Sequence, residues 1–237
     1  DAHTVRLVAT GERVRAANIL IATGASPSLG PPIPGIEHVI SSNEVFYLRE
    51  FPRRILIQGG SYIAVEFACI FAGLGAQVSL VYRGDNILRG FDDDLRHQVR
   101  VEMEKRGVHV ITGSTVTAVE PMGKQFSVQL SSGGLTVTAD QVMFALGRPP
   151  NVAGLELDKA GVALDGNGAI AVNEYSRTSV PHIYAVGDVT NRINLTPVAI
   201  REGHAFADTV FGGKPTKVDH TNVPTAVFSE PEIGTIG

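Results

Sequence analysis

The chain has 237 residues, enough for one large domain or for two of the usual ~100–150 residues. Its 43% hydrophobic and 19% charged residues exclude a disordered, coiled-coil or collagen-like chain. The net charge of -4 does not suggest a nucleic-acid-binding surface, and the one cysteine, Cys69, cannot form an internal disulfide.

No apolar run nears the ~18–20 residues that a membrane helix needs. We therefore expect no membrane partner, no nucleic-acid partner and a cytoplasmic location. The 7 histidines show no metal-ligand spacing, so we expect no metal site. Because the chain begins at Asp1 without Met and ends within a predicted element, we also expect an internal fragment of a longer protein.

Short β-type runs alternate with helical stretches along the chain, and Gly and Pro residues separate them. The pattern predicts strands at 5–9, 13–22, 54–58, 77–82, 108–112, 141–146, 169–172 and 182–186, and helices at 62–74, 92–106 and 195–211. Alternation over 115–119, 126–130 and 135–138 predicts an antiparallel meander. Residues 19–24 form an apolar run too continuous for a half-exposed strand, so we expect them to be buried.

A predicted strand ends and a predicted helix begins within residues 59–64. A dinucleotide-binding turn has Gly first for the tight turn, Gly third for approach to the pyrophosphate, and a small sixth residue for helix–strand packing. Gly59 and Ala64 fit this pattern, whereas Ser61 stands where the second Gly belongs. The sequence favours nucleotide binding over a turn that binds nothing.

The end of the next strand indicates which nucleotide binds. NAD sites usually carry an acid ~20 residues after the glycines, and its carboxylate accepts from the ribose 2′-OH. Here Arg83 directly follows the strand, and Arg89 lies six residues later in the same loop. The nearest acid, Asp85, lies in the loop beyond the strand end. Two guanidinium groups can hold a 2′-phosphate that a carboxylate would repel. The pattern therefore favours NADPH over NADH, against the alternative of two solvated arginines.

A strand also runs into Gly187-Asp188, which can place a carboxylate at the carboxyl edge of a sheet, although Gly-Asp is equally an ordinary turn.

Together the motifs resemble the class I pyridine-nucleotide disulfide oxidoreductases, and within that family the members that reduce glutathione disulfide. The match covers essentially the whole chain and is carried by residues 21–24, 60–66, 83 with 89–92, 145–151, 184–188, 195–199 and 224–228.

The predicted fold is α/β of the Rossmann-like FAD/NAD(P)-binding type, a parallel sheet with an antiparallel β-meander insertion. We expect residues 1–24 to end the first segment of an FAD-binding domain and residues 25–150 to form the NADPH-binding domain. Residues 151–221 would form the central part of the FAD domain, and residues 222–237 would begin a truncated dimerisation or interface domain.

The resemblance implies FAD and NADPH as cofactors and assigns residues to each. Tyr62 would cover the flavin until nicotinamide displaces it, and Glu66 would lie near the nicotinamide. On the NADPH side the assigned residues are Gly59, Gly60, Ser61, Tyr62, Ile63, Glu66, Arg83, Arg89, Gly147, Arg148, Leu195 and Ala226. On the FAD side they are Thr23, Gly24, Asp188 and Thr196.

The reaction implied by the resemblance is FAD-dependent, NADPH-driven reduction of a low-molecular-weight disulfide, with glutathione disulfide as the first expectation, in a homodimeric parent protein. A relative acting on trypanothione, mercuric ion or dihydrolipoamide is an alternative, and so is a non-catalytic nucleotide-binding fragment. The family's redox-active cysteine pair and His–Glu pair lie outside this sequence. We therefore assign no catalytic residue here and expect the fragment alone to be inactive.

Overall fold

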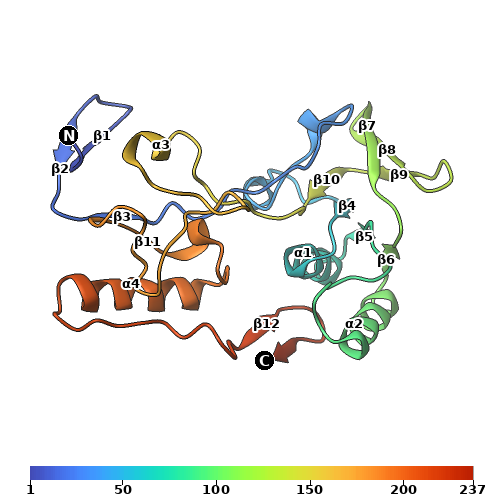
Figure 1. The fold of residues 1–237 in the computed structure, drawn as a ribbon. Helices are drawn as coiled ribbons and strands as arrows, with labels where there is room; N and C mark the ends of the chain where they lie inside the picture. The colour runs from blue at the N-terminus through green and yellow to red at the C-terminus, as the bar shows by residue number, and fades with distance from the viewer. Residues whose placement is uncertain (237) are drawn as a thin grey trace. The chain divides into compact units, whose positions relative to one another are not determined.

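The computed structural model describes residues 1–236, which form two compact units. The first unit consists of Asp1–Ser26 and Arg148–Asn222, and the second of Pro27–Gly147 with the chain from Val223 onward. Figure 1 shows the helices and strands of both units. The polypeptide therefore passes between the units three times, after residues 26, 147 and 222.

The second unit contains a four-stranded parallel sheet with the order β10-β4-β5-β6. Its strands are β4 (Arg54–Gln58), β5 (Gln77–Val81), β6 (Val108–Ile111) and β10 (Gln141–Phe144), and the helices after β4 and β5 are α1 (Tyr62–Gly73) and α2 (Asp93–Lys105). Successive strands run outward from β4 to β6, and β10 lies on the other side of β4. The strand order thus reverses between β4 and β10, where sheets of this kind bind ligands at the carboxyl ends of the strands. The predicted α/β fold is confirmed.

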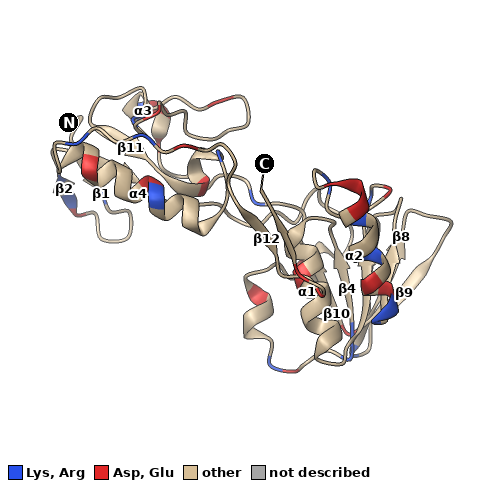
Figure 2. Ribbon diagram, turned by 90° about the horizontal axis from the view of Figure 1, so that it is seen from below, with Lys and Arg blue, Asp and Glu red and all other residues tan. Residues whose placement is uncertain are grey.

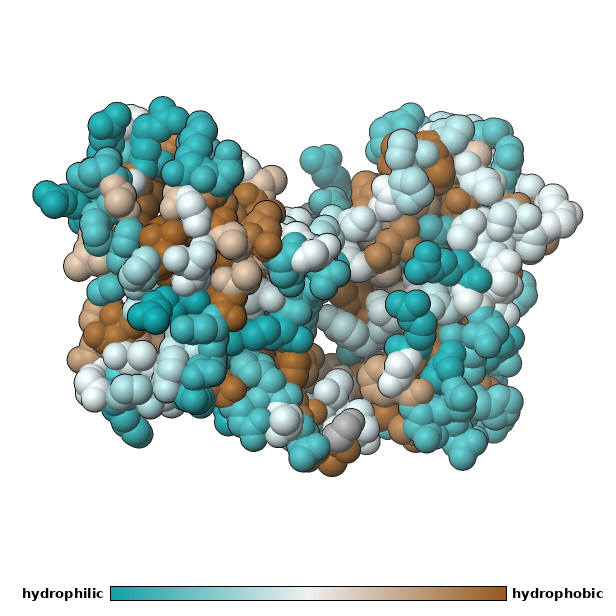
Figure 3. Space-filling model, in the orientation of Figure 1, coloured by the Kyte–Doolittle hydropathy of each residue, from teal (hydrophilic) through white to brown (hydrophobic). Residues whose placement is uncertain are grey.

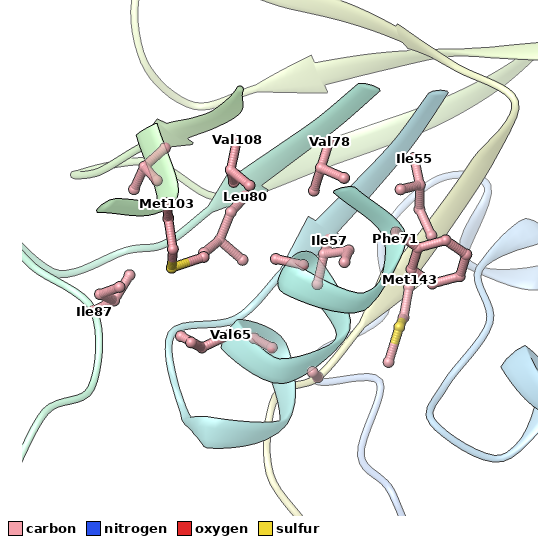
Figure 4. Close-up of a cluster of buried hydrophobic side chains, with 14 of the residues drawn as sticks. Ile55, Ile57, Val65, Phe71, Val78, Leu80, Ile87, Met103, Val108 and Met143 are labelled. Carbon is pink, nitrogen blue, oxygen red and sulfur yellow. The ribbon is translucent and has the colours of Figure 1, made fainter. Parts of the chain in front are cut away.

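This sheet is buried on both faces because side chains alternate along its strands. Ile55 and Ile57 of β4 lie in one core with Leu80 of β5 and Met103 of α2 (Figure 4). Leu56, between them in sequence, joins a second core that includes the side chains of the meander. The two helices therefore pack on one face of the sheet and the meander packs on the other.

The predicted β-meander is present as a three-stranded antiparallel sheet, β7-β8-β9. Its strands are β7 (Val116–Met122), β8 (Gln125–Leu130) and β9 (Thr136–Ala139). Gly133 and Gly134, which join β8 to β9, both have positive φ angles, of 59° and 71°. The buried side chain of Gln58 ties the meander to the carboxyl end of β4, because its Oε1 accepts from the Val116 N–H.

The first unit contains two small sheets. Its elements are β1 (Thr4–Arg6), β2 (Arg13–Arg15), β3 (Ile19–Ile21), α3 (Leu157–Ala160), β11 (Ile183–Ala185), the 3-10 helix η3 (Gly187–Thr190) and α4 (Thr196–Val210). β1 and β2 form an antiparallel hairpin, and β3 pairs in parallel with β11. α4 begins with Pro in its first turn, where the missing N–H is not needed.

Three expectations for this unit were wrong. The single strand predicted over 13–22 is two strands, because the chain changes partner: the Ala16 N–H donates to His3, whereas the Ile19 N–H donates to His182. The run at 19–24 is only half-buried, and Leu20 is 39% exposed, because β3 has one strand neighbour among the described residues. Residues 169–172 form no strand, only an isolated bridge at Ile170.

The remaining elements lie in the second unit. They are the 3-10 helices η1 (Ile36–His38) and η2 (Glu44–Tyr47) and the antiparallel strands β12 (Thr225–Val227) and β13 (Ile233–Thr235). Val227 and Ile233 are buried in the core that also contains α1. Large hydrophobic side chains are also exposed, and brown patches break the hydrophilic surface in Figure 3. No helix within residues 1–236 is both long and apolar enough to cross a membrane.

Candidate functional site

The turn after β4 can be built only with glycine at its first position. Gly59 has a φ of +153°, and a Cβ there would lie 2.5 Å from the Ala145 carbonyl oxygen and 3.0 Å from the Ala64 Cβ. Ala145 follows β10 and donates its N–H to the Gln58 carbonyl. Gly59 therefore lets the end of β10 and the start of α1 approach the same point, as the sequence pattern predicted for Gly59 and Ala64.

Ser61 is the N-cap of α1, yet its hydroxyl makes no capping hydrogen bond. The first N–H groups of α1 therefore lack a side-chain acceptor from the N-cap. Unpaired N–H groups at a helix N-terminus, together with the helix dipole, favour binding of an anion. The hydroxyl of Ser61 is exposed and free to meet a ligand rather than needed for the helix.

The loop after β5 is fixed against this turn. Leu88 has a φ of 53°, and its N–H donates to the Gly60 carbonyl at 2.6 Å. Ile87 and Leu88 are buried, at 0% and 1% exposure, whereas Arg83 and Arg89 on either side of them are exposed. Neither arginine side chain has an ion pair or hydrogen bond within residues 1–236. The loop thus holds two unpaired guanidinium groups beside the glycine turn.

The nearest acid is directed elsewhere. Asp85 Oδ1 lies 3.7 Å from Nη2 of Arg96 on α2. The Arg96 guanidinium also donates to two loop carbonyls, with Nε 2.8 Å from the Ile87 oxygen and Nη2 3.0 Å from the Asn86 oxygen. In the ribbon of Figure 2, acidic (red) and basic (blue) positions both occur along α2. Arg96 thus holds the loop through two backbone carbonyls and forms an ion pair with Asp85. Arg83 and Arg89 therefore have no carboxylate of the loop as a counter-charge.

A cleft of about 720 Å³ lies at the carboxyl ends of the sheet, within the second unit. Of the predicted site residues it is lined by Gly59, Gly60, Ser61, Arg83, Arg89 and Gly147. Sequence reasoning missed Tyr82, which also lines the cleft, and Gly84, where a Cβ would lie 2.6 Å from the Tyr82 ring. The aromatic residue at the strand end and the glycine that follows it are the signal that could have found them.

Four more predicted residues lie in the second unit but do not line the cleft. Tyr62, Ile63 and Glu66 stand on the first turns of α1, and Ala226 is in β12. Glu66 is half-buried, and its Oε1 accepts from the Phe228 N–H at 3.0 Å. This hydrogen bond joins α1 to the segment after β12.

The other predicted residues belong to the first unit. Thr23 Oγ1 donates to the Asn151 carbonyl at 2.8 Å, and the Asn151 N–H donates to Gly24, which has a φ of +68°. Arg148, predicted on the NADPH side, donates to the Ala25 carbonyl at 2.7 Å. These bonds join the segment after β3 to the segment after Gly147. The geometry thus gives Arg148 a partner in the first unit rather than a place in the cleft.

Two polar groups near η3 and α4 lack partners. Asp188, in η3, is half-buried, and its carboxylate has no hydrogen bond or ion pair within the described residues. Asn194 Oδ1, just before Leu195 and Thr196, is buried without a hydrogen-bond partner there. Unpaired buried polar atoms are rare in proteins and call for a ligand or water. This part of the first unit therefore fits a polar ligand at the N-terminus of α4.

No group of three or more His, Cys, Asp or Glu side chains within the described residues could hold a metal ion. Cys69 is half-buried on α1 and packs against the core of the second unit. Burial raises the pKa of its thiol above the ordinary value, which disfavours the reactive thiolate. Its setting agrees with a small packed side chain.

The chain is 55% identical over 232 residues to a glutathione reductase of Burkholderia cepacia, which covers 98% of this chain and 51% of that protein. It is 51% identical over 231 residues to a trypanothione reductase of Trypanosoma congolense, and this match covers 95% of the chain and 46% of that protein. The solved structure of an HOCl-induced flavoprotein disulfide reductase, RclA from Escherichia coli, superposes with a TM-score of 0.91 at 30% identity, covering 100% of this chain and 54% of that one. The chain thus spans about half the length of these proteins.

The family comparison agrees with the geometry of the glycine turn and the parallel sheet. Residues 1–203 match the family described as pyridine nucleotide-disulphide oxidoreductase. The match includes the sheet, the cleft, η3 and the first half of α4. The chain belongs to the pyridine nucleotide-disulphide oxidoreductase family.

Proposed function

We propose that the protein of which this chain is a part uses NADPH and FAD to reduce a low-molecular-weight disulfide, glutathione disulfide before others. Family membership and the glutathione reductase relative support the reaction class. The observation that carries the choice of NADPH is the pair Arg83 and Arg89, which line the same cleft as the glycine turn and have no counter-charge of their own. A 2′-phosphate supplies that charge.

The cleft residues fit NADPH. The pyrophosphate would lie over Gly59 and Gly60 at the N-terminus of α1, where N–H groups and the helix dipole stabilise its charge. Arg83 and Arg89 would hold the 2′-phosphate, with Ser61 and Gly147 at the edges of the cleft. As the family resemblance implies, we also assign to the NADPH side Tyr62, Ile63, Glu66, Arg148, Leu195 and Ala226.

The first unit fits FAD. Thr23 and Gly24 would bound the site, and Asp188, whose carboxylate is unpaired, would accept hydrogen bonds from the ribityl–pyrophosphate region. Thr196 begins α4, whose N-terminal N–H groups suit negative charge at the pyrimidine end. The chemistry that FAD supplies when bound is acceptance of a hydride from NADPH and delivery of the electron pair to a disulfide.

The trypanothione reductase relative supports a second substrate, trypanothione disulfide. An activity panel of the full-length protein with both disulfides decides between them.

We also propose a homodimeric full-length protein and a cytoplasmic location. The 237-residue chain by itself carries one cysteine, so we expect it to turn over no disulfide, because a single thiol cannot cycle as a dithiol.

The decisive experiment measures NADPH and NADH binding by calorimetry. Removing one charged hydrogen-bond partner costs ~1.5–3 kcal/mol, so Arg83→Ala is expected to weaken NADPH binding about tenfold or more and leave NADH binding unchanged. Arg53→Ala is the matched control, since Arg53 is an exposed arginine directly before β4, at the opposite end of the strand from the cleft. An unsubstituted protein that bound NADH as tightly as NADPH would refute the proposal.

A further inference from the structure

The first unit contains a fully buried carboxylate that sequence reasoning did not single out. Glu202 lies in the middle of α4 and is 1% exposed. A carboxylate this deeply buried is costly unless charged and hydrogen-bonding partners surround it. Glu202 has such partners, and they come from three separate parts of the unit.

The two oxygens of Glu202 have different partners. Oε2 accepts from the Gly187 N–H at 2.6 Å. Oε1 lies 2.9 Å from Nη2 of Arg192 and 2.7 Å from Nε2 of His220. One oxygen therefore holds the backbone of η3, and the other meets two nitrogen donors from the segments after η3 and near the end of the unit.

The bond to Gly187 fixes a backbone turn that other groups also constrain. Gly187 has a φ of +73°, and a Cβ there would lie 3.3 Å from the Ala199 Cβ of α4. Thr190 Oγ1 donates to the Gly187 carbonyl at 2.8 Å and accepts from Arg192 Nε at 3.3 Å. Glu202 thus holds the N–H of Gly187 and Thr190 holds its carbonyl, and Arg192 contacts both of these side chains.

The next residue along the chain is Asp188, whose unpaired carboxylate we assign to the flavin. A buried ion pair adds little net stability compared with apolar packing, and in some proteins buried polar groups instead specify one arrangement of the chain. We propose that Glu202 is a positioning residue for flavin binding: through the Gly187 N–H it fixes the Val186–Gly187 peptide, and so the backbone that carries Asp188, with the Asp188 carboxylate placed for FAD. The inference rests on the proposed function.

The test replaces Glu202 by Gln, which keeps the shape of the side chain but leaves one acceptor oxygen. Because Arg192 and His220 both donate to that oxygen, the amide NH₂ of E202Q faces the Gly187 N–H. Two donors then lie opposite each other and no hydrogen bond forms. Phe206→Ala is the matched control: Phe206 is on the same helix, 8% exposed, and packs on the Tyr184 ring at 5.1 Å between ring centroids. It destabilises the same unit without touching Gly187.

Two measurements are made on the full-length protein: the Kd for FAD, from quenching of flavin fluorescence on reconstitution, and the thermal midpoint of the apoprotein. We expect E202Q to raise the Kd about tenfold or more, the loss of one hydrogen bond to a charged group. We expect Phe206→Ala to lower the midpoint at least as much as E202Q does but to change the Kd less than twofold. If E202Q does not fold, Glu202→Asp, which retracts the carboxylate by one methylene, takes its place with the same expectation.

If the Kd for FAD rises in proportion to the fall in thermal midpoint, and does so to the same extent in the Glu202 variant and in Phe206→Ala, the inference is overturned and Glu202 is merely structural. So would a Glu202 variant that binds FAD as tightly as the unsubstituted protein, while the proposed function would stand. An unsubstituted protein that binds no FAD would overturn the proposed function and this inference together.

Discussion

The ring of Tyr82 lies against Gly60: a Cβ at position 60 would be 2.5 Å from two carbons of that ring. Tyr82 follows β5, whereas Gly60 follows β4, the neighbouring strand. The middle glycine of the turn is therefore required by the protein's own side chain. This differs from the first glycine, Gly59, which is required by the backbone at Ala145.

Gly60→Ala is expected to destabilise the protein by ~1–3 kcal/mol, the usual result of forcing an extra carbon into packed surroundings. Denaturant unfolding measures the change. Gly73→Ala, at the last residue of α1 with open space around it, is the control and is expected to change stability by no more than about 0.5 kcal/mol. Adding Tyr82→Ala to Gly60→Ala should recover part of the loss; strictly additive effects of the two substitutions would contradict the contact.

Arg96 should matter for NADPH binding although it lies on α2 and carries no assigned contact with the cofactor. Its side chain is 14% exposed, and its guanidinium donates to the Asn86 and Ile87 carbonyls, which lie between Arg83 and Arg89 in the sequence. Arg96→Met leaves these carbonyls without their donor, at a cost of ~1–3 kcal/mol. We expect lower stability and weaker NADPH binding, measured by unfolding and by calorimetry.

Lys105→Met on the same helix is the control for Arg96. Lys105 forms an exposed ion pair with Glu102 at 2.8 Å, and such pairs contribute ~0–1 kcal/mol. If the Arg96→Met protein binds NADPH as tightly as the Lys105→Met protein does, Arg96 does not support NADPH binding by holding this loop.

The sequence predicted the fold class because its strongest signals are local. β4 has the predicted bounds, α1 ends one residue before the predicted helix does, and α2 is one residue shorter than predicted at each end. Contacts between distant residues left no such signal. Nothing in the sequence pairs Gly60 with Tyr82 or Glu202 with Gly187, because these contacts arise only when strands and helices pack. The half-burial of β3 was missed for the same reason: an apolar run does not reveal how many neighbours a strand has.

The thiol of Cys69 should react slowly in the folded chain. Burial raises its pKa above the ordinary value, so at any pH near neutrality the folded chain holds less thiolate than the unfolded chain. The 237-residue chain has no other cysteine, so alkylation by iodoacetamide reports on this one thiol. We expect alkylation at pH 7–8 to be slower in buffer than in denaturant, with the folded chain's rate rising only at higher pH.

The same shift predicts a loss of stability in alkali. A raised pKa in the folded state means that the unfolded chain releases its proton first, from about pH 8.5, the ordinary thiol value. Stability attributable to Cys69 is therefore complete below that pH and decreases as pH rises toward the folded-state pKa. Cys69→Ala should remove this part of the alkaline slope in urea unfolding measured between pH 7 and 10. Identical slopes for the two proteins would show that burial of the thiol is too slight to shift its ionisation.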